Sequence, residues 1–320
     1  MHRFWVVVAS TMALICTLTA CSSGSDDSDT SSDRTVVVEH QYGSTTVPVA
    51  PKRVITIGGA WADSIIRIGE PITAEFVAEG YSGKDNRFAW TPEHKSTVVS
   101  YDSMKGIPET AQLAKFTPDL ILAGYIPDRE TYDRLAAIAP TVGVMAKATI
   151  TDSWRDVMST VGKIYDKQKQ ADEAIAEVDK QIASVKAKYP ASQGKTASFG
   201  QLTPQKQFGV ITSDTDPAAK LLAEFGLVLD PAVKSLSSNG DRVLVSSERI
   251  DLLRSDLLIF WPLAGGPETF EAIPGWNNLP AVRSGATVYL TNDNASAFSA
   301  PSIYSVPWAV EKLTPALAKL

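Results

Sequence analysis

Residues 153–189 carry the longest helical pattern in the chain, and the rest of the sequence forms two comparable halves on either side of it. Apolar side chains recur there mostly at steps of three or four, so they would share one helix face. These are Trp154, Val157, Val161, Ile164, Ala171, Ile175, Val178, Ile182 and Val185. Ser153 is a suitable N-cap, and Pro190 ends the pattern.

A single helix over these 37 residues would be about 55 Å long, which exceeds one small domain. We therefore expect two helices, with a break at Gly162 or within the polar residues 166–170. A coiled coil is the less favoured alternative because it requires sustained heptads. The pattern indicates a stiff connector between two lobes.

The composition is that of a globular protein large enough for two domains. Of the 320 residues, 44% are hydrophobic, so each half can bury its own core. The formal net charge is −6, whereas a nucleic-acid-binding protein needs a basic face. The charge therefore argues against nucleic acid as the main partner.

The N-terminus has the pattern of an export signal. A basic start precedes an apolar run over residues 4–18, which is too short for a comfortable membrane span. Residues 18–21 (LTAC) look like a bacterial lipobox, in which the cysteine is lipidated and becomes the new N-terminus. We predict a lipoprotein signal peptide at 1–20, lipidation of Cys21 and a disordered tether at 21–34. The alternative is an ordinary signal peptide followed by a stray thiol.

Cys21 would be the only cysteine of the mature chain, which leaves no structural disulfide and no cysteine metal site. The protein is expected outside the cytoplasmic membrane, attached to it by lipid alone. The sequence leaves open whether the host has one membrane or two.

Short β-branched runs alternate with helical patterns in both halves. A hairpin is expected at 35–47, followed by strands at 54–57, 73–77, 98–99, 120–123 and 141–144, and in the second half at 196–199, 208–211, 257–260 and 287–290. Helices are expected at 62–68, 109–115, 129–138, 217–224, 248–253 and 303–317. The alternation is typical of mostly parallel, helix-covered sheets. We predict an N-terminal α/β lobe at 35–150, a helical linker at 151–190 and a C-terminal α/β lobe at 191–320.

Two segments correspond across the halves. Residues 113–122 (LAKFTPDLIL) and 250–259 (IDLLRSDLLI) each read as a helix end, a polar turn, an aspartate and a strand. The similarity is short, but it suggests that both lobes follow one plan.

Catalytic patterns are weak. The chain has three histidines, and His2 lies in the signal, so only His40 and His94 could serve a triad or a metal site. Neither a P-loop nor a dinucleotide fingerprint occurs. We therefore predict that the protein is not an enzyme, although an exported hydrolase or an adhesion module remains a minor alternative.

Several motifs resemble one family along residues 35–320. They are Pro51, Lys52, Arg53, Val54 and Ile55; Pro118, Asp119, Leu120 and Ile121; Gly275 and Trp276; and Val282, Arg283, Ser284 and Gly285. In this order they look like the substrate-binding proteins of ABC importers for ferric siderophores, haem and cobalamin. The resemblance implies two α/β lobes joined by one long α-helix, a ligand cleft between them and little closure on binding.

The resemblance also implies the function. We expect a monomeric receptor that captures a ferric siderophore, a small-molecule iron chelate, and delivers it to an ABC transporter permease for iron uptake. Haem or cobalamin is the alternative on the same fold, because fold does not fix the ligand. No cofactor is expected. Since the chelate's own oxygens would hold the iron, we predict no bond from protein to metal.

Ligands of open α/β sheets bind beyond the carboxyl ends of the strands. Aromatic side chains and cations at these places would suit a bulky, negatively charged chelate. The candidates are Trp61, Arg87, Tyr101, Lys105, Tyr125, Arg242, Trp261, Phe298 and Tyr304. Lys105 stands where some hydroxamate-binding relatives carry arginine. For each aromatic residue the alternative is packing within a lobe.

Members of this family dock on the permease through one glutamate on each lobe. Glu248 stands eight residues before Asp256, which is the family's spacing. The same spacing from Asp119 falls on Ala111, so Glu109 is the nearest substitute. The alternative is that both acids only complement helix N-termini.

Overall fold

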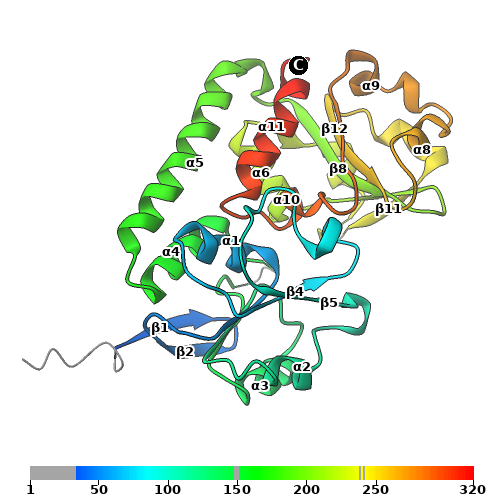
Figure 1. Cartoon of the computed structure of the whole chain (residues 1–320). Helices are drawn as coiled ribbons and strands as arrows, with labels where there is room; N and C mark the ends of the chain where they lie inside the picture. The colour runs from blue at the N-terminus through cyan, green and yellow to red at the C-terminus, as the bar shows by residue number, and fades with distance from the viewer. Residues whose placement is uncertain (1–33, 148–150, 238, 241) are drawn as a thin grey trace, which may run out of the picture.

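The computed structural model describes residues 34–147, 151–237, 239–240 and 242–320. The described chain forms two α/β lobes, and a long helix, α5 (Gln168–Lys188), runs along one side of both (Figure 1). The expected signal peptide, the lipidation site Cys21 and nearly all of the expected tether lie outside the described residues.

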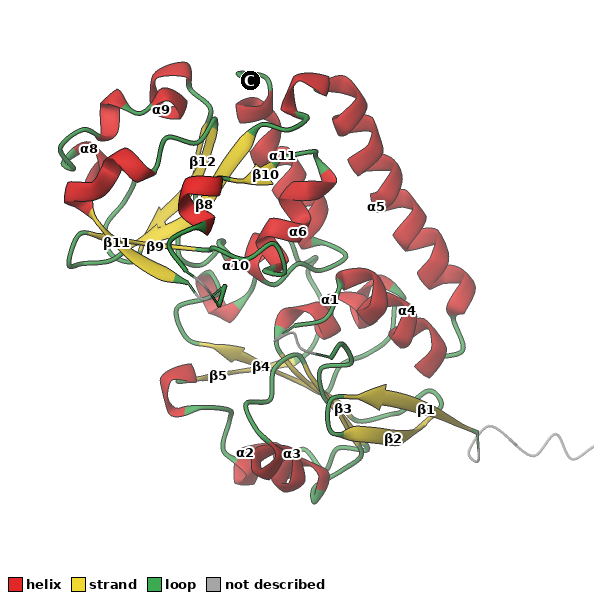
Figure 2. Ribbon diagram, turned by 180° about the vertical axis from the view of Figure 1, so that it is seen from behind, coloured by secondary structure: helices red, strands yellow, loops and turns green. Residues whose placement is uncertain are grey.

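The N-terminal lobe is built on a parallel sheet with the strand order β5-β4-β3-β6-β7. Its strands are β3 (Val54–Ile57), β4 (Ala74–Ala78), β5 (Thr97–Tyr101), β6 (Leu120–Ala123) and β7 (Thr141–Val142). The hairpin of β1 (Thr35–His40) and β2 (Gly43–Pro48) lies beside this sheet, as expected (Figure 2). The helices are α1 (Gly59–Arg67), α2 (Thr110–Ala114) and α3 (Arg129–Ala136).

The C-terminal lobe has a mixed sheet with the order β11-β9-β8-β12-β13, and β10 pairs with β8. Its strands are β8 (Thr196–Leu202), β9 (Gln207–Val210), β10 (Val228–Leu229), β11 (Val243–Ser246), β12 (Leu257–Pro262) and β13 (Thr287–Tyr289). Its α-helices are α6 (Pro217–Glu224), α7 (Pro231–Lys234), α8 (Glu268–Glu271), α9 (Pro280–Ser284), α10 (Ser296–Ser299) and α11 (Ser305–Leu317). The helix expected at 248–253 is a 3-10 helix at Ser247–Leu252.

The expected break in the connector is confirmed. The first helix, α4 (Trp154–Ile164), is capped by Ser153, whose hydroxyl accepts a hydrogen bond from the Asp156 amide. α5 begins after a three-residue turn, in which Asp166 has a positive φ of 55°. α4 packs on α1 of the N-terminal lobe, and α5 continues from it to the C-terminal lobe, where it contacts α11. The 21 residues of α5 span about 32 Å.

The similar segments of the two halves are structurally equivalent. Asp119 precedes β6 and accepts hydrogen bonds from the amides of Lys52 and Arg53, which precede the neighbouring strand β3. Asp256 precedes β12 and accepts one from the amide of Thr196, the first residue of β8. In each lobe the aspartate joins two adjacent parallel strands at their N-terminal ends.

Candidate functional site

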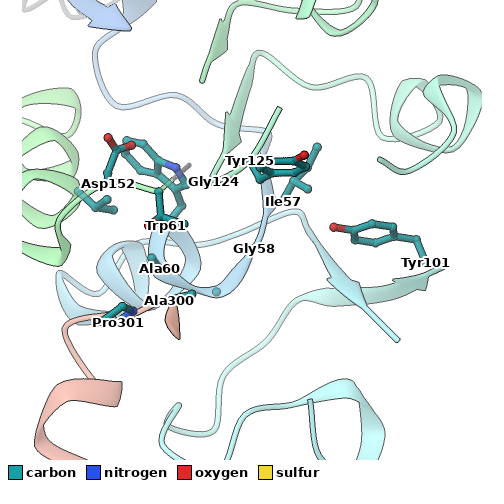
Figure 3. A pocket seen from close by; sticks show the side chains of 13 residues that line it. Ile57, Gly58, Ala60, Trp61, Tyr101, Gly124, Tyr125, Asp152, Ala300 and Pro301 are labelled. Atoms are coloured by element: carbon teal, nitrogen blue, oxygen red, sulfur yellow. The ribbon is translucent and has the colours of Figure 1, made fainter. Parts of the chain in front are cut away.

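A cavity of about 160 Å³ lies where the two lobes meet, beyond the carboxyl ends of β3, β5 and β6 (Figure 3). It is lined by Ile57, Gly58, Gly59, Ala60, Trp61, Tyr101, Gly124, Tyr125, Thr151, Asp152, Val157, Ala300 and Pro301. Most of these residues belong to the N-terminal lobe, and Ala300 and Pro301 come from the loop between α10 and α11. The cavity is small against the roughly 300–1,000 Å³ of typical ligand pockets, so it would hold one part of a bulky ligand.

The turn from β3 into α1 places Trp61 at the cavity. Gly58 has a φ of 96°, a backbone conformation that residues with a Cβ rarely adopt, and α1 starts at the next residue. Trp61 is therefore in the first turn of α1, where its side chain is fully buried. Its indole N–H has no hydrogen-bond acceptor among the described residues. A ligand oxygen at the cavity could accept this hydrogen bond.

Two tyrosines form the other side of the cavity. Tyr101 is the last residue of β5, and burial raises the pKa of its phenol. Tyr125 follows β6 by two residues and is 50% exposed. Figure 3 shows the rings of both tyrosines on the side of the cavity opposite Trp61. The rings offer apolar faces and neutral hydroxyl groups to a ligand.

Asp152 is the one charged side chain among the described residues that line the cavity. Its carboxylate accepts hydrogen bonds from the amides of Met145, at 2.9 Å, and Ala146, at 2.8 Å. Burial raises the pKa of this carboxyl above its ordinary value, against the opposing effect of the two amides. The sequence reasoning missed Asp152, although its place directly before the connector helices could have indicated it.

The three cations expected at the site lie elsewhere. The Arg87 guanidinium is 3.2 Å from Nε2 of His94. Lys105 pairs with Asp102 at 3.3 Å and lines a separate polar depression of the N-terminal lobe. Arg242 pairs with Asp216, also at 3.3 Å. None of the three lines the cavity, so the expectation of a cationic pocket is not met there.

Three of the expected aromatic residues belong to the packing of the molecule. Trp261 is 4% exposed and lies inside β12, which runs two residues further than we predicted. Phe298 is fully buried in α10 and packs on Phe199 at 5.8 Å between ring centroids. Tyr304 is contacted by the guanidinium of Arg67, 5.9 Å from the ring centroid. For Trp261 and Phe298 the lobe-packing alternative describes the structure, whereas the half-buried Tyr304 contacts Arg67 of the other lobe.

Direct contacts hold the lobes together beside the cavity. Asp63 of α1 is buried and accepts hydrogen bonds from Trp90, from Thr91 and, across the lobe boundary, from Ser302. Burial raises the pKa of Asp63 to about 6, although the three hydrogen bonds oppose the shift. The indoles of Trp90 and Trp308 also meet across the boundary, 5.5 Å apart. Sequence reasoning missed this network because its members are far apart in the chain.

The two candidate docking glutamates are both on the surface. Glu109 is the N-cap residue of α2, and its side chain makes no capping hydrogen bond. Glu248 lies in the first turn of the 3-10 helix at Ser247–Leu252. Both side chains are exposed and accessible to a partner.

Within the described chain, no helix has the length and apolar character that crossing a membrane requires. No cluster of three or more histidine, cysteine, aspartate or glutamate side chains suited to a metal ion occurs in the same residues.

Comparisons with known proteins agree with the two-lobed fold. The Fe(3+)-citrate-binding protein YfmC of Bacillus subtilis is 25% identical over 303 residues, which cover 92% of this chain and 91% of that protein. The putative ABC transporter substrate-binding lipoprotein YhfQ of the same organism is 25% identical, with 87% and 88% covered.

Among solved structures, PiaA of Streptococcus pneumoniae in complex with ferrichrome superimposes with a TM-score of 0.70 at 25% identity. The match covers 88% of this chain and 99% of PiaA. The family described as periplasmic binding protein matches residues 84–294, which is more than half of the chain. The chain therefore belongs to the periplasmic binding protein family.

Proposed function

We propose that this protein captures a ferric siderophore outside the cytoplasmic membrane and delivers it to an ABC permease. The observation that carries the proposal is the aromatic cavity between two lobes that one helix joins. Relatives of nearly full length are a ferric-citrate-binding protein and a structure with ferrichrome bound. The protein binds and releases its ligand without a catalytic step, and the chelate supplies the iron ligands.

Ligand binding can be measured through tryptophan fluorescence, because Trp61 lines the cavity. Addition of a ferric siderophore should quench the emission, whereas the iron-free chelator should act more weakly. Tyr125→Ala should weaken binding about tenfold, since it removes a half-exposed ring from the cavity. Tyr81→Ala removes a tyrosine that is 48% exposed and does not line the cavity, and it serves as the control. If no ferric chelate binds, the proposal fails.

We further propose that the mature chain begins at a lipidated Cys21. YhfQ is described as a lipoprotein, and the sequence around Cys21 has the lipobox pattern. Cells that express the chain should incorporate labelled palmitate into it, and Cys21→Ser should abolish the label. Label retained by the variant would place the modification elsewhere.

Glu109 and Glu248 are proposed as the contacts with the permease. Both are exposed and stand at the start of helical segments in their lobes. The double variant Glu109→Lys and Glu248→Lys should reduce uptake strongly and leave ligand affinity unchanged. A matched control reverses the exposed Glu93 and Glu271. Equal loss of uptake in both double variants would contradict a specific role of Glu109 and Glu248 in permease contact.

A further inference from the structure

The described residues that line the cavity include no lysine or arginine. Asp152 is the one residue with a charged side chain at neutral pH among the described residues that line it, so the lining carries no cation. The N-terminus of α1 faces the cavity through Gly59 and Ala60 and contributes about half a positive charge. The carboxylate of Asp152 more than offsets this contribution. The lining therefore has no excess of positive charge.

The cations that line the adjacent cavity do not change this result, because carboxylates compensate their charge. A second cavity shares Asp152 and Pro301 with the first and is lined by Arg155, Lys220 and Glu224. Arg155 already pairs with Asp179 at 2.5 Å and with Glu224 at 2.7 Å. The charges of Arg155 and Lys220 are balanced by those of Asp179 and Glu224, so the charge of Asp152 remains for the first cavity. Residues 148–150, which precede the shared Thr151, are Ala-Thr-Ile and carry no charge.

The side-chain hydrogen-bond donors that the cavity offers are neutral. The indole N–H of Trp61 is buried without an acceptor within the described part of the chain. Tyr101 and Tyr125 add phenol hydroxyls. Such donors can bind carbonyl or hydroxamate oxygens, but they cannot neutralise several negative charges that lose their water on binding.

On these grounds we propose that, within the siderophore-receptor function above, this protein selects ferric chelates of zero or positive net charge. Three hydroxamates carry three negative charges and neutralise Fe³⁺, whereas three catecholates carry six and leave a net charge of −3. The charge of a trihydroxamate chelate therefore suits the lining of this cavity, and the charge of a triscatecholate or polycarboxylate chelate does not. The relatives do not decide the matter, since their names include both Fe(3+)-citrate and ferrichrome.

The test compares two chelates of different charge on the purified protein. Ferrichrome, which is neutral, should bind about 100-fold more tightly than ferric enterobactin, which carries three negative charges. Equal or tighter binding of ferric enterobactin would overturn the charge inference and leave the receptor function standing. If neither of these chelates, nor ferric citrate, binds at all, the receptor function itself fails.

A pair of variants tests whether charge is the cause of the selection. Ala300 lines the cavity from the C-terminal lobe and is exposed, so a longer side chain there should not disturb the core. Ala300→Lys should narrow the preference for ferrichrome about tenfold by improving the affinity for ferric enterobactin. Ala300→Gln has a comparable length without the charge and should leave the preference unchanged. Equal effects of the two substitutions would show that size, and not charge, decides the selection.

Discussion

The two lobes use aromatic residues near the ends of their central strands in opposite ways. In the N-terminal lobe, Tyr101 and Tyr125 stand at or just after the ends of β5 and β6 and line the cavity. In the C-terminal lobe, Trp261 and Phe298 pack on Phe199, with ring centroids 5.1 and 5.8 Å away.

Strand length explains part of this difference. β6 ends at Ala123, so Tyr125 emerges beyond the sheet. The equivalent strand β12 continues to Pro262, and Trp261 pairs in register with Gln201 of β8. An aromatic side chain at a similar position relative to the strand therefore faces the cavity in one lobe (Tyr125) and the core in the other (Trp261). Ligand contacts should be concentrated in the N-terminal lobe.

The largest expected effect is a difference in stability between variants of a core aromatic residue and of a cavity aromatic residue. Phe298→Ala empties a fully buried position and should lower the free energy of unfolding by about 3–5 kcal/mol. Tyr125→Ala, at a half-exposed position, should lower it by less than about 1 kcal/mol. Urea denaturation measures both values. Comparable losses would mean that the two aromatic residues have the same role.

The next effect concerns two carboxylates, Asp63 of the N-terminal lobe and Asp256 of the C-terminal lobe, whose pKa values are shifted in opposite directions. The pKa of Asp63 in the folded state, about 6, lies above its ordinary value of 3.8, so the folded state holds the proton longer than the unfolded state does. Stability should therefore fall as pH rises from about 4 to 6, by about 3 kcal/mol from this group. Urea denaturation at pH 4 and pH 7 should show the fall in the native protein relative to Asp63→Asn.

Asp256 is the contrasting group. Burial tends to raise its pKa, but hydrogen bonds from Thr196 and Lys195 lower it below the ordinary value. Its contribution to stability should be present above about pH 4 and be lost as pH falls further. The pH dependence of Asp256→Asn relative to the native protein should have the opposite sign to that of Asp63→Asn, and the same sign for both would contradict the assignment.

A third comparison tests the shared plan of the lobes. Asp119→Ala and Asp256→Ala each leave strand-start amides without their carboxylate acceptor. Each should cost about 1.5–3 kcal/mol of unfolding free energy, because a charged acceptor is lost. The Asn variants, which keep one oxygen acceptor, should cost less. If only one of the two alanine variants loses stability, the two aspartates occupy equivalent positions but do not stabilise their lobes equally.

The smallest expected effect is at the lobe connection. Arg155 of α4 joins Asp179 of α5 to Glu224 of α6, and its side chain is 34% exposed. Arg155→Met should lower the free energy of unfolding by about 1 kcal/mol, since partly exposed ion pairs contribute little. Arg134→Met breaks contacts to Glu130 and Thr131 within α3 and is the control. Only the first variant should increase hydrogen exchange in both α4 and α6.

Several features could be predicted from local pattern. The strand Leu120–Ala123 and the helix Pro217–Glu224 begin and end at the predicted residues, because short apolar runs and an Asp-Pro start are local signals. The length of β12 could not be predicted, since its pairing with β8 sets it. The 3-10 form of Ser247–Leu252 also differs from the predicted helix. Likewise, Trp61, Tyr101 and Tyr125 were correctly placed near the cavity, but the residue pattern could not separate them from Trp261.

The sequence alone determined the two α/β halves, the helical connector with its break and the candidate family, since these depend on periodicity and on motifs of a few residues. The tertiary structure decided which aromatic side chains reach the cavity, and it placed Asp152 there without a cation. It also joined Asp63 to Ser302, 239 residues apart in the chain. Burial and charge at such places depend on contacts between distant segments, and no local pattern records those contacts.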